Sequence, residues 1–278
     1  IYFSDCMSIA LRLILRTQKG YPSVKRKWGE LPYPWKQAGS MDFFGGDVNG
    51  ITQKLDYLQA LGITGIYTTP IFEATSNHKY DITNFFHVDK HFGGDDALAE
   101  LRAESSKRDM TLMLDITPNH CSYKHPWVTN FKDNIDGDTS EFFYYDAEKD
   151  EFETWLGVPS LIKLNYSSQK LREVMYRNQN SAIRKWLEPP YSVDAWRLDV
   201  ANMTGNQGAD QLDHTVWREL RDYARQSNSD TYLLGEYFQV PEYIMFYTIT
   251  VCFLFHTYAM THSFKMAKIV RKWKKLES

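Results

Sequence analysis

Three segments of the chain place polar side chains at the end of an apolar run. The polar residues are Asp115, Asn119 and His120 in LDITPNH, Arg197 and Asp199 in DAWRLD, and Glu236 in YLLGEYF. Because parallel α/β sheets build their sites at the carboxyl edge, these side chains are predicted to meet there. A single acid at a strand end is usually a helix cap or a surface charge. Three such ends in succession favour a site instead.

Arg197 and Asp199 are two residues apart on a predicted strand, so their side chains share a face. The guanidinium is expected to favour the ionised carboxylate of Asp199 and to depress its pKa. Glu236 follows one strand–helix unit later, on the neighbouring strand. Carboxyl groups on adjacent strands can approach to about 5–5.5 Å, the separation used by retaining glycosidases, with a buried Glu held protonated. The alternative is a structural Arg–Asp pair with an unrelated Glu.

The elements that must position these residues alternate between strand and helix. Strands are predicted at 63–69, 111–116, 193–198 and 231–235 from their β-branched, aromatic and apolar runs. One helix is predicted before the first strand, through Ile51, Leu55, Leu58 and Leu61 to a stop at Gly62. Three more are predicted between the strands: one that begins at a cap at Asp95 or Asp96, one through Ala182–Leu187 that ends at Pro189 and Pro190, and one through Leu212–Tyr223. This rhythm predicts a parallel α/β sheet with right-handed crossovers.

Composition narrows the class of protein. The chain has 278 residues, of which 43% are hydrophobic and 15% aromatic, and its net charge is −3. This charge balance argues against a nucleic-acid partner. The aromatic content fits a large core or, alternatively, a cleft that stacks sugar rings. Cys6, Cys121 and Cys252 are too widely spaced for a zinc pattern or a disulfide framework, which favours a reducing compartment and a cytoplasmic location.

The motifs resemble those of a known family. LDITPNH, DAWRLDVANM and YLLGEYF are similar to the segments on the third, fourth and fifth barrel strands of the alpha-amylase superfamily. SNHKYD at 76–81, FFGGDVNGI at 43–51 and SLIKLNY at 160–166 resemble its neopullulanase, cyclomaltodextrinase and maltodextrin-glucosidase branch. The resemblance runs from about residue 41 to 238 and includes several motifs in the expected order.

The resemblance implies a TIM-type (β/α)8 barrel, truncated here after the fifth strand, with a short B-domain insertion after the third strand. The expected divisions are 1–120 for the N-terminal part of the barrel, 121–165 for the insertion, 166–240 for the barrel continuation with nucleophile and acid/base, and 241–278 for an atypical apolar and then basic tail.

The resemblance also implies roles for individual residues. Asp199 would be the nucleophile, Glu236 the general acid/base, and Arg197 the group that orients Asp199. The remaining substrate-site residues would be His120, Asn119, Tyr80, Asp115, His78 and Asp81, with Tyr80 stacking on the sugar and Asp115 supporting the site. No cofactor is expected. Some relatives bind calcium near a Gly-Gly-Asp turn, which would point to Gly45 and Asp47.

The implied function is hydrolysis of α-1,4-glucans such as maltodextrins, cyclodextrins and pullulan, by double displacement with retention. The family also uses a third carboxylate, an Asp after a His on the seventh strand, and residues 237–278 contain no Asp. This keeps an alternative open, namely a glucan-binding relic or truncated gene product without turnover. The predicted partner is an oligosaccharide, and a homodimer stays an open alternative.

The segment 243–260 is largely apolar and is followed by a basic cluster between Lys265 and Lys275. Three interpretations stay open for it. It is non-homologous sequence from a truncated or mis-spliced gene model, a barrel element that has drifted beyond recognition, or a membrane anchor with a basic cytoplasmic flank.

Overall fold

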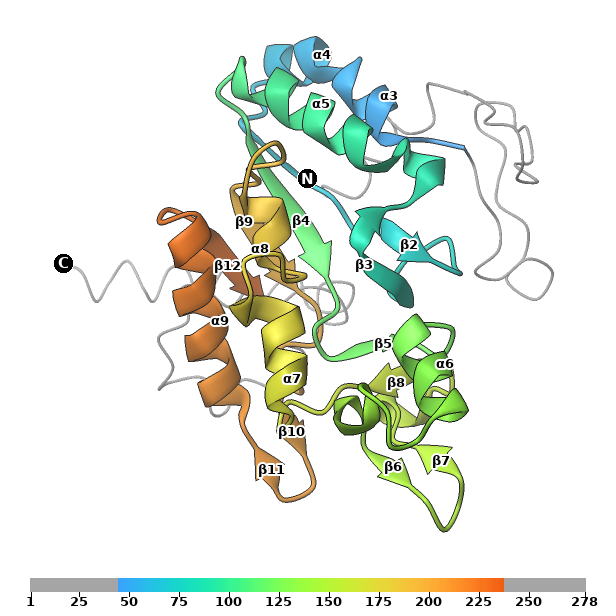
Figure 1. Cartoon of the computed structure of the whole chain (residues 1–278). Coiled ribbons are helices and arrows are strands. Elements are labelled where there is room, and N and C mark those ends of the chain that lie inside the picture. The colour runs from blue at the N-terminus through green and yellow to red at the C-terminus, as the bar shows by residue number, and fades with distance from the viewer. Residues whose placement is uncertain (1–44, 238–278) are drawn as a thin grey trace, which may run out of the picture.

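The computed structural model describes residues 45–237, and a four-stranded parallel sheet forms its centre (Figure 1). The strand order is β1 (Gly65–Tyr67), β4 (Thr111–Ile116), β9 (Ala195–Leu198) and β12 (Tyr232–Gly235), with each neighbouring pair parallel. The four strands fall within the ranges expected from the sequence. The prediction of a parallel α/β sheet is therefore confirmed for this part of the chain.

Helices connect successive strands and pack against the sheet or against one another. The helix α5 packs on β4 and on α3, while α9 contacts α8 and η5. Two helices precede β1, namely α3 (Val48–Thr52) and α4 (Leu55–Ala60). The helical segments between the strands of the sheet are α5 (Gly94–Ser106), α7 (Gln169–Arg172), the π-helical turn η5 (Glu173–Arg177), α8 (Arg184–Leu187) and α9 (Asp213–Ser227). Trp186 of α8 and Trp196 of β9 are both fully buried in the core. Burial of such large aromatic side chains supplies much of the hydrophobic stabilisation.

Two details of the helices differ from the sequence prediction. The single helix expected through Ile51 and Leu61 is broken into α3 and α4, and Leu61 is 54% exposed. The break lies at Lys54, whose backbone leaves the helical region without any Gly or Pro to mark it. Gly62 does follow the helix with a φ of 81°, as expected of a residue after a helix end.

The predicted cap of α5 at Asp95 or Asp96 is wrong. Gly93 precedes the helix with a φ of 100°, and the two aspartates lie in its first turn. Carboxylates there interact favourably with the positive end of the helix dipole without acting as caps. Asp95 also accepts a hydrogen bond from the backbone N–H of Val88 at 2.7 Å.

Residues 120–163, which lie between β4 and α7, leave the sheet as an insertion (Figure 1). Its two ends meet in an antiparallel pair, β5 (His120–Ser122) with β8 (Leu161–Lys163). Between these strands lie α6 (Pro126–Asp133), η3 (Ser140–Phe142), the pair β6 (Tyr145–Asp146) and β7 (Glu151–Phe152), and η4 (Trp155–Gly157). The long segment predicted at 121–165 is therefore a folded unit, and the pairing of β5 with β8 holds its two ends together.

Two further pairs and one short turn complete the described chain. The hairpin of β2 (Phe72–Ala74) and β3 (Ile82–Val88) follows β1, and η2 (Lys90–Phe92) leads into α5. The pair of β10 (Asn206–Gln207) and β11 (Asp210–Gln211) precedes α9. Within residues 45–237, none of the helices is long and apolar enough to cross a membrane. The apolar segment 243–260 and the tail 241–278 lie outside the described residues.

His125 makes the insertion sensitive to acid. Its Nδ1 accepts a hydrogen bond from the backbone N–H of Trp127 at the start of α6, and burial lowers its pKa to about 3. Because the unfolded chain protonates near pH 6.5 and the folded chain does not, the histidine costs about 1.4 kcal/mol of stability per unit as pH falls from 6.5 toward 3.

Asn can cap a helix without titrating, so His125→Asn is expected to flatten this dependence. The test is urea unfolding of parent and variant at pH 7 and pH 5, with the difference between the two proteins as the readout. An unchanged difference at the two pH values would show that His125 binds protons equally in the folded and unfolded states, and would contradict the lowered pKa.

Candidate active site

The register of the sheet brings the chemically active side chains to one edge. Asp115 of β4 and Arg197 of β9 are direct Cα partners across the parallel pair. Beyond the strand ends the ladder continues, since the Asp199 N–H donates to the Ile116 carbonyl and the Glu236 N–H to the Leu198 carbonyl, both at 2.9 Å. The backbone therefore fixes Asp115, Arg197, Asp199 and Glu236 side by side at the carboxyl edge, as the sequence predicted.

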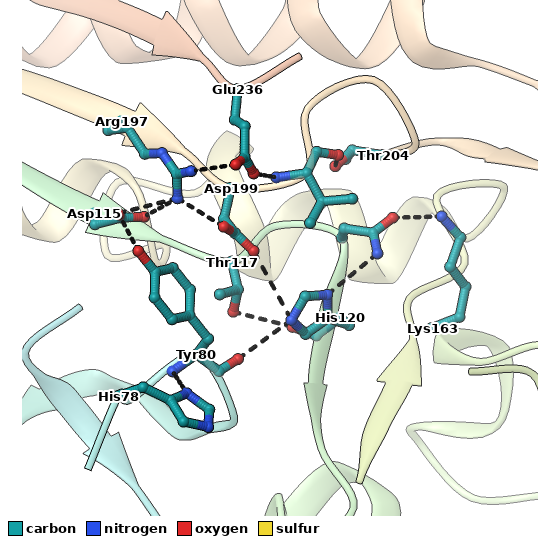
Figure 2. A network of polar contacts seen from close by, with 12 residues as sticks. His78, Tyr80, Asp115, Thr117, His120, Lys163, Arg197, Asp199, Thr204 and Glu236 are labelled. Atoms are coloured by element: carbon teal, nitrogen blue, oxygen red, sulfur yellow. Dashed lines mark hydrogen bonds and ion pairs between the residues drawn. The ribbon is translucent and has the colours of Figure 1, made fainter. Parts of the chain in front are cut away.

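One guanidinium binds three carboxylates (Figure 2). Arg197 Nη1 donates to Asp199 Oδ1 at 2.6 Å and to Asp115 Oδ2 at 3.0 Å, while Nη2 lies 2.9 Å from Glu236 Oε1. The Asp115 side chain is fully buried, that of Asp199 is 9% exposed, and that of Glu236 is 21% exposed. Glu236 is thus the most accessible of the three carboxyl groups.

Two tyrosines also bind Asp115. Tyr67 donates its hydroxyl to Asp115 Oδ2 at 2.5 Å, and Tyr80 donates to the same oxygen at 3.2 Å. Burial raises the pKa of both phenols, and the Asp115 carboxylate raises them further, so both remain donors. Tyr67 was not selected from the sequence, although it ends β1 as Asp115 nearly ends β4. The same rule of polar residues at strand ends would have found it.

The electrostatic prediction for Asp199 is wrong. Burial raises its pKa well above the usual range, Arg197 offsets part of this effect, and the carboxylates of Asp115 and Glu236 raise the pKa again. Burial likewise raises the pKa of Asp115 to about 6, against the lowering effect of Arg197. A single cation shared by three acids cannot hold all of them ionised as firmly as a private partner would.

The residue after Asp199 is conformationally strained. Val200 has a φ of 51°, in the left-handed region that a β-branched residue rarely adopts. This turn directs the Val200 N–H to Glu236 Oε2 at 3.0 Å. The Thr204 hydroxyl donates to the Val200 carbonyl at 3.1 Å and holds the turn in place. The turn at Val200 therefore connects the residue after Asp199 to the carboxyl group of Glu236.

His120 lies at the base of the insertion and faces Asp199. It is 1% exposed, and its Nε2 is 3.2 Å from the Tyr80 carbonyl oxygen and 4.0 Å from Asp199 Oδ2. Burial lowers its pKa to about 4, so the ring is neutral at pH 7. Trp155 of η4, which the sequence analysis did not select, stacks on His120 with ring centroids 5.7 Å apart.

The loop that carries Tyr80 contains the other two predicted site residues. His78 is exposed, stacks beside Tyr80 with centroids 6.0 Å apart, and accepts a hydrogen bond from the Tyr80 N–H at 3.1 Å. Asp81 is buried, and its carboxylate accepts hydrogen bonds from the backbone and hydroxyl groups of Thr75 and Ser76. Asp81 thus stabilises the loop. Tyr80 and Asp115 instead belong to the group of side chains that surrounds Arg197.

The two residues suggested for calcium, Gly45 and Asp47, lie at the start of the described chain, and Asp47 has a structural contact there. Asp47 is buried and uses Oδ1 to cap α3 by accepting the Gly50 N–H at 2.8 Å. Gly45 has a φ of 79° at the preceding turn. Between residues 45 and 237, no group of three or more His, Cys, Asp or Glu side chains is arranged to hold a metal ion.

Comparison with known proteins identifies the family. The family model for the alpha-amylase catalytic domain matches residues 23–277. A cyclomaltodextrinase from Geobacillus thermopakistaniensis is 35% identical over 228 residues, which cover 80% of this chain and 36% of the relative. An intracellular maltogenic amylase from Bacillus subtilis is 34% identical over 216 residues, which cover 76% and 34%.

Solved structures agree with this assignment. The type III pullulan hydrolase from Thermococcus kodakarensis aligns with a TM-score of 0.67 and 30% identity over 85% of this chain and 41% of that one. The described chain is an α/β protein with a parallel sheet and an acid cluster, formed by Asp115, Asp199 and Glu236, at the carboxyl edge of that sheet. The structural neighbours imply that this sheet is part of a TIM barrel. The chain belongs to the alpha-amylase family. It spans about a third of the length of the curated relatives above.

Proposed function

We propose that the chain carries the nucleophile and the acid/base of a glycoside hydrolase acting on α-1,4-glucans with retention. The observation that carries the proposal is the binding of Asp199 and Glu236 to the two Nη atoms of one guanidinium. Carboxyl groups held this way lie close together, as the retaining mechanism needs and the wider inverting arrangement does not. The names of the relatives, among them cyclomaltodextrinase and maltogenic amylase, support maltodextrins and cyclodextrins as substrates.

In this proposal Glu236 protonates the glycosidic oxygen while Asp199 attacks the anomeric carbon. The glycosidic bond breaks, the leaving alcohol departs with the proton, and a covalent glycosyl ester forms on Asp199. Glu236 then removes a proton from water, which displaces Asp199 and restores both groups. The greater exposure of Glu236 suits a group that must reach the leaving oxygen and the water.

The surrounding side chains support binding of a neutral sugar. The Tyr80 carbonyl contacts His120 and the Trp155 ring stacks on it, so two aromatic residues lie close to His120, and aromatic faces stack on the apolar faces of pyranose rings. A neutral His120 can donate a hydrogen bond without placing a second positive charge beside Asp199. Arg197 then remains the cation that holds the nucleophile.

The test is incubation of the full chain with maltotriose, β-cyclodextrin and an aryl α-maltoside, followed by NMR of the first product formed. Retention predicts that the α-anomer appears first and the β-anomer only by later mutarotation. Release of the β-anomer first would contradict double displacement.

A second candidate is glucan binding without turnover. It is the alternative left open above, in which the third carboxylate of the family pattern is not supplied; residues 237–278 contain no Asp, and the chain spans about a third of the length of its relatives. Loss of a group that stabilises the transition state costs orders of magnitude in rate but little ground-state binding. Calorimetric titration with acarbose or maltoheptaose separates the two. Binding without product favours this candidate, and binding with product favours the hydrolase.

The remaining expectations about location and assembly stay predictions. They are the cytoplasmic location, the homodimer, the truncation after the fifth strand and the membrane-anchor interpretation of 243–260. Fractionation of the full chain against a form ending at Val240 tests the anchor, because an anchor predicts that only the longer form follows the membranes.

A further inference from the structure

A lysine ammonium is buried beside the candidate active site. Lys163, the last residue of β8, is 2% exposed, and its Nζ donates to Asn119 Oδ1 at 2.5 Å and to the Met203 carbonyl oxygen at 2.6 Å. Burying a cation carries a large desolvation cost, which lowers the Lys163 pKa to about 8. The proposed chemistry gives this lysine no role, although it lies within the SLIKLNY motif.

The ammonium decides which way the Asn119 side chain faces. An ammonium has donors only, so the amide atom that it contacts must be the oxygen. The amide nitrogen then faces His120 Nδ1, at 3.2 Å. Because the amide nitrogen is also a donor only, Nδ1 of His120 must accept. The proton of the neutral ring therefore lies on Nε2.

The other side of the ring is consistent with this assignment (Figure 2). His120 Nε2 lies 3.2 Å from the Tyr80 carbonyl oxygen, which can only accept, and 4.0 Å from Asp199 Oδ2. A proton on Nε2 makes both contacts favourable. A proton on Nδ1 would set two donors against each other at Asn119 and two acceptors against each other at Tyr80.

We propose that Lys163 is a positioning residue that fixes His120 as the Nε2–H tautomer through Asn119. The ring then presents a donor toward the Tyr80 carbonyl and the Asp199 carboxylate. Lys163 also binds the Met203 carbonyl, in the loop that follows Asp199. One ammonium thus connects the insertion, the loop after β4 and the loop after the nucleophile. The tautomer assignment does not depend on the proposed hydrolysis.

The test is ¹⁵N NMR of the full chain with labelled histidine at pH 7, well above the His120 pKa of about 4. Long-range ¹H–¹⁵N correlations distinguish Nδ1–H from Nε2–H, and His120→Gln identifies the signals. In the parent, Nε2 is expected to be protonated in essentially all molecules. In Lys163→Met the amide is free to turn over, so the single-tautomer pattern is lost and Nδ1–H appears.

Asn119→Asp provides a second, opposite perturbation. A carboxylate accepts from both Lys163 and His120, so Nδ1 becomes protonated, either as the other neutral tautomer or as the imidazolium. Lys149→Met is the matched control, because Lys149 lies in the same insertion with its side chain 70% exposed and pairs only locally with Asp146 among the described residues. This control retains the parent pattern.

Three results would each overturn the proposal. They are a parent ring protonated on Nδ1, a folded Lys163→Met protein that keeps Nε2–H alone, and an Asn119→Asp protein whose Nδ1 stays unprotonated. Should Lys163→Met fail to fold, the parent and Asn119→Asp spectra still decide the matter. A merely structural role of Lys163 would alter stability without moving the proton between the ring nitrogens.

Discussion

Replacement of Asp199 by Asn is expected to lower turnover of an aryl α-maltoside by at least about 10³-fold. The amide has nearly the same shape and can still accept from Arg197, yet it cannot form the glycosyl ester. The substitution also removes one of three negative charges around a single guanidinium, so the variant should be at least as stable as the parent. The measurements are steady-state rates and urea unfolding on the same preparations.

The matched control is Asp222→Asn on the exposed surface of α9, where the side chain is 60% exposed. It makes the same chemical change away from the acid cluster and should leave the rate unchanged. Calorimetric affinity for maltoheptaose should stay close to the parent value in Asp199→Asn. Equal turnover by parent and variant would remove Asp199 from the nucleophile role.

Replacement of Arg197 by Met is expected to lower the free energy of unfolding by about 3–5 kcal/mol at pH 7. Methionine fills part of the same volume but leaves Asp115, Asp199 and Glu236 without the guanidinium that binds all three. Asp115 is fully buried, so bulk solvent does not reach it to replace that contact. Urea unfolding of parent and variant measures the difference.

The loss should depend on pH in a defined direction. The carboxyl pKa values, already raised by burial for Asp115 and Asp199, rise further without the cation. The folded variant then binds protons that the unfolded chain, with pKa values near 4, has released. Its stability therefore increases as pH falls from neutral toward 5, and the deficit shrinks.

Arg221→Met serves as the control for the loss of a guanidinium. Its side chain is 41% exposed and pairs with the adjacent Asp222, so the change should stay within about 1 kcal/mol. A deficit of Arg197→Met that grows on acidification would contradict the shared-guanidinium account.

The strands were predictable because each is a short run whose residue types suit a buried parallel sheet. The run TLMLDI coincides with β4, and the others differ from β1, β9 and β12 by a residue or two at their ends. The helix through Leu61 was not predictable in detail. Periodicity cannot detect a bend at Lys54 when no Gly, Pro or polar cap marks it.

The meeting of Asp115, Arg197, Asp199 and Glu236 at one sheet edge was predictable, whereas the pKa shifts of the two aspartates were not. Sequence spacing placed Arg197 beside Asp199, and this implied a private ion pair with a lowered pKa. The register of β4 against β9 brings Asp115 to the same guanidinium, and this register is set by tertiary pairing. Tyr67 follows the same strand-end rule and could have been selected, whereas the role of Lys163 depends on contact with Asn119, which is 44 residues away in the sequence.

The antiparallel closure of β5 on β8 has a consequence for how this chain can vary. Because the insertion begins and ends at the same place, its interior can lengthen or shorten without displacing the strands it joins, at an entropic cost that grows only slowly with length. The insertion can therefore be exchanged as a unit, because its first and last residues, His120 and Lys163, are paired with each other. Natural or engineered changes inside the insertion can therefore leave the positions of Asp115, Asp199 and Glu236 unchanged.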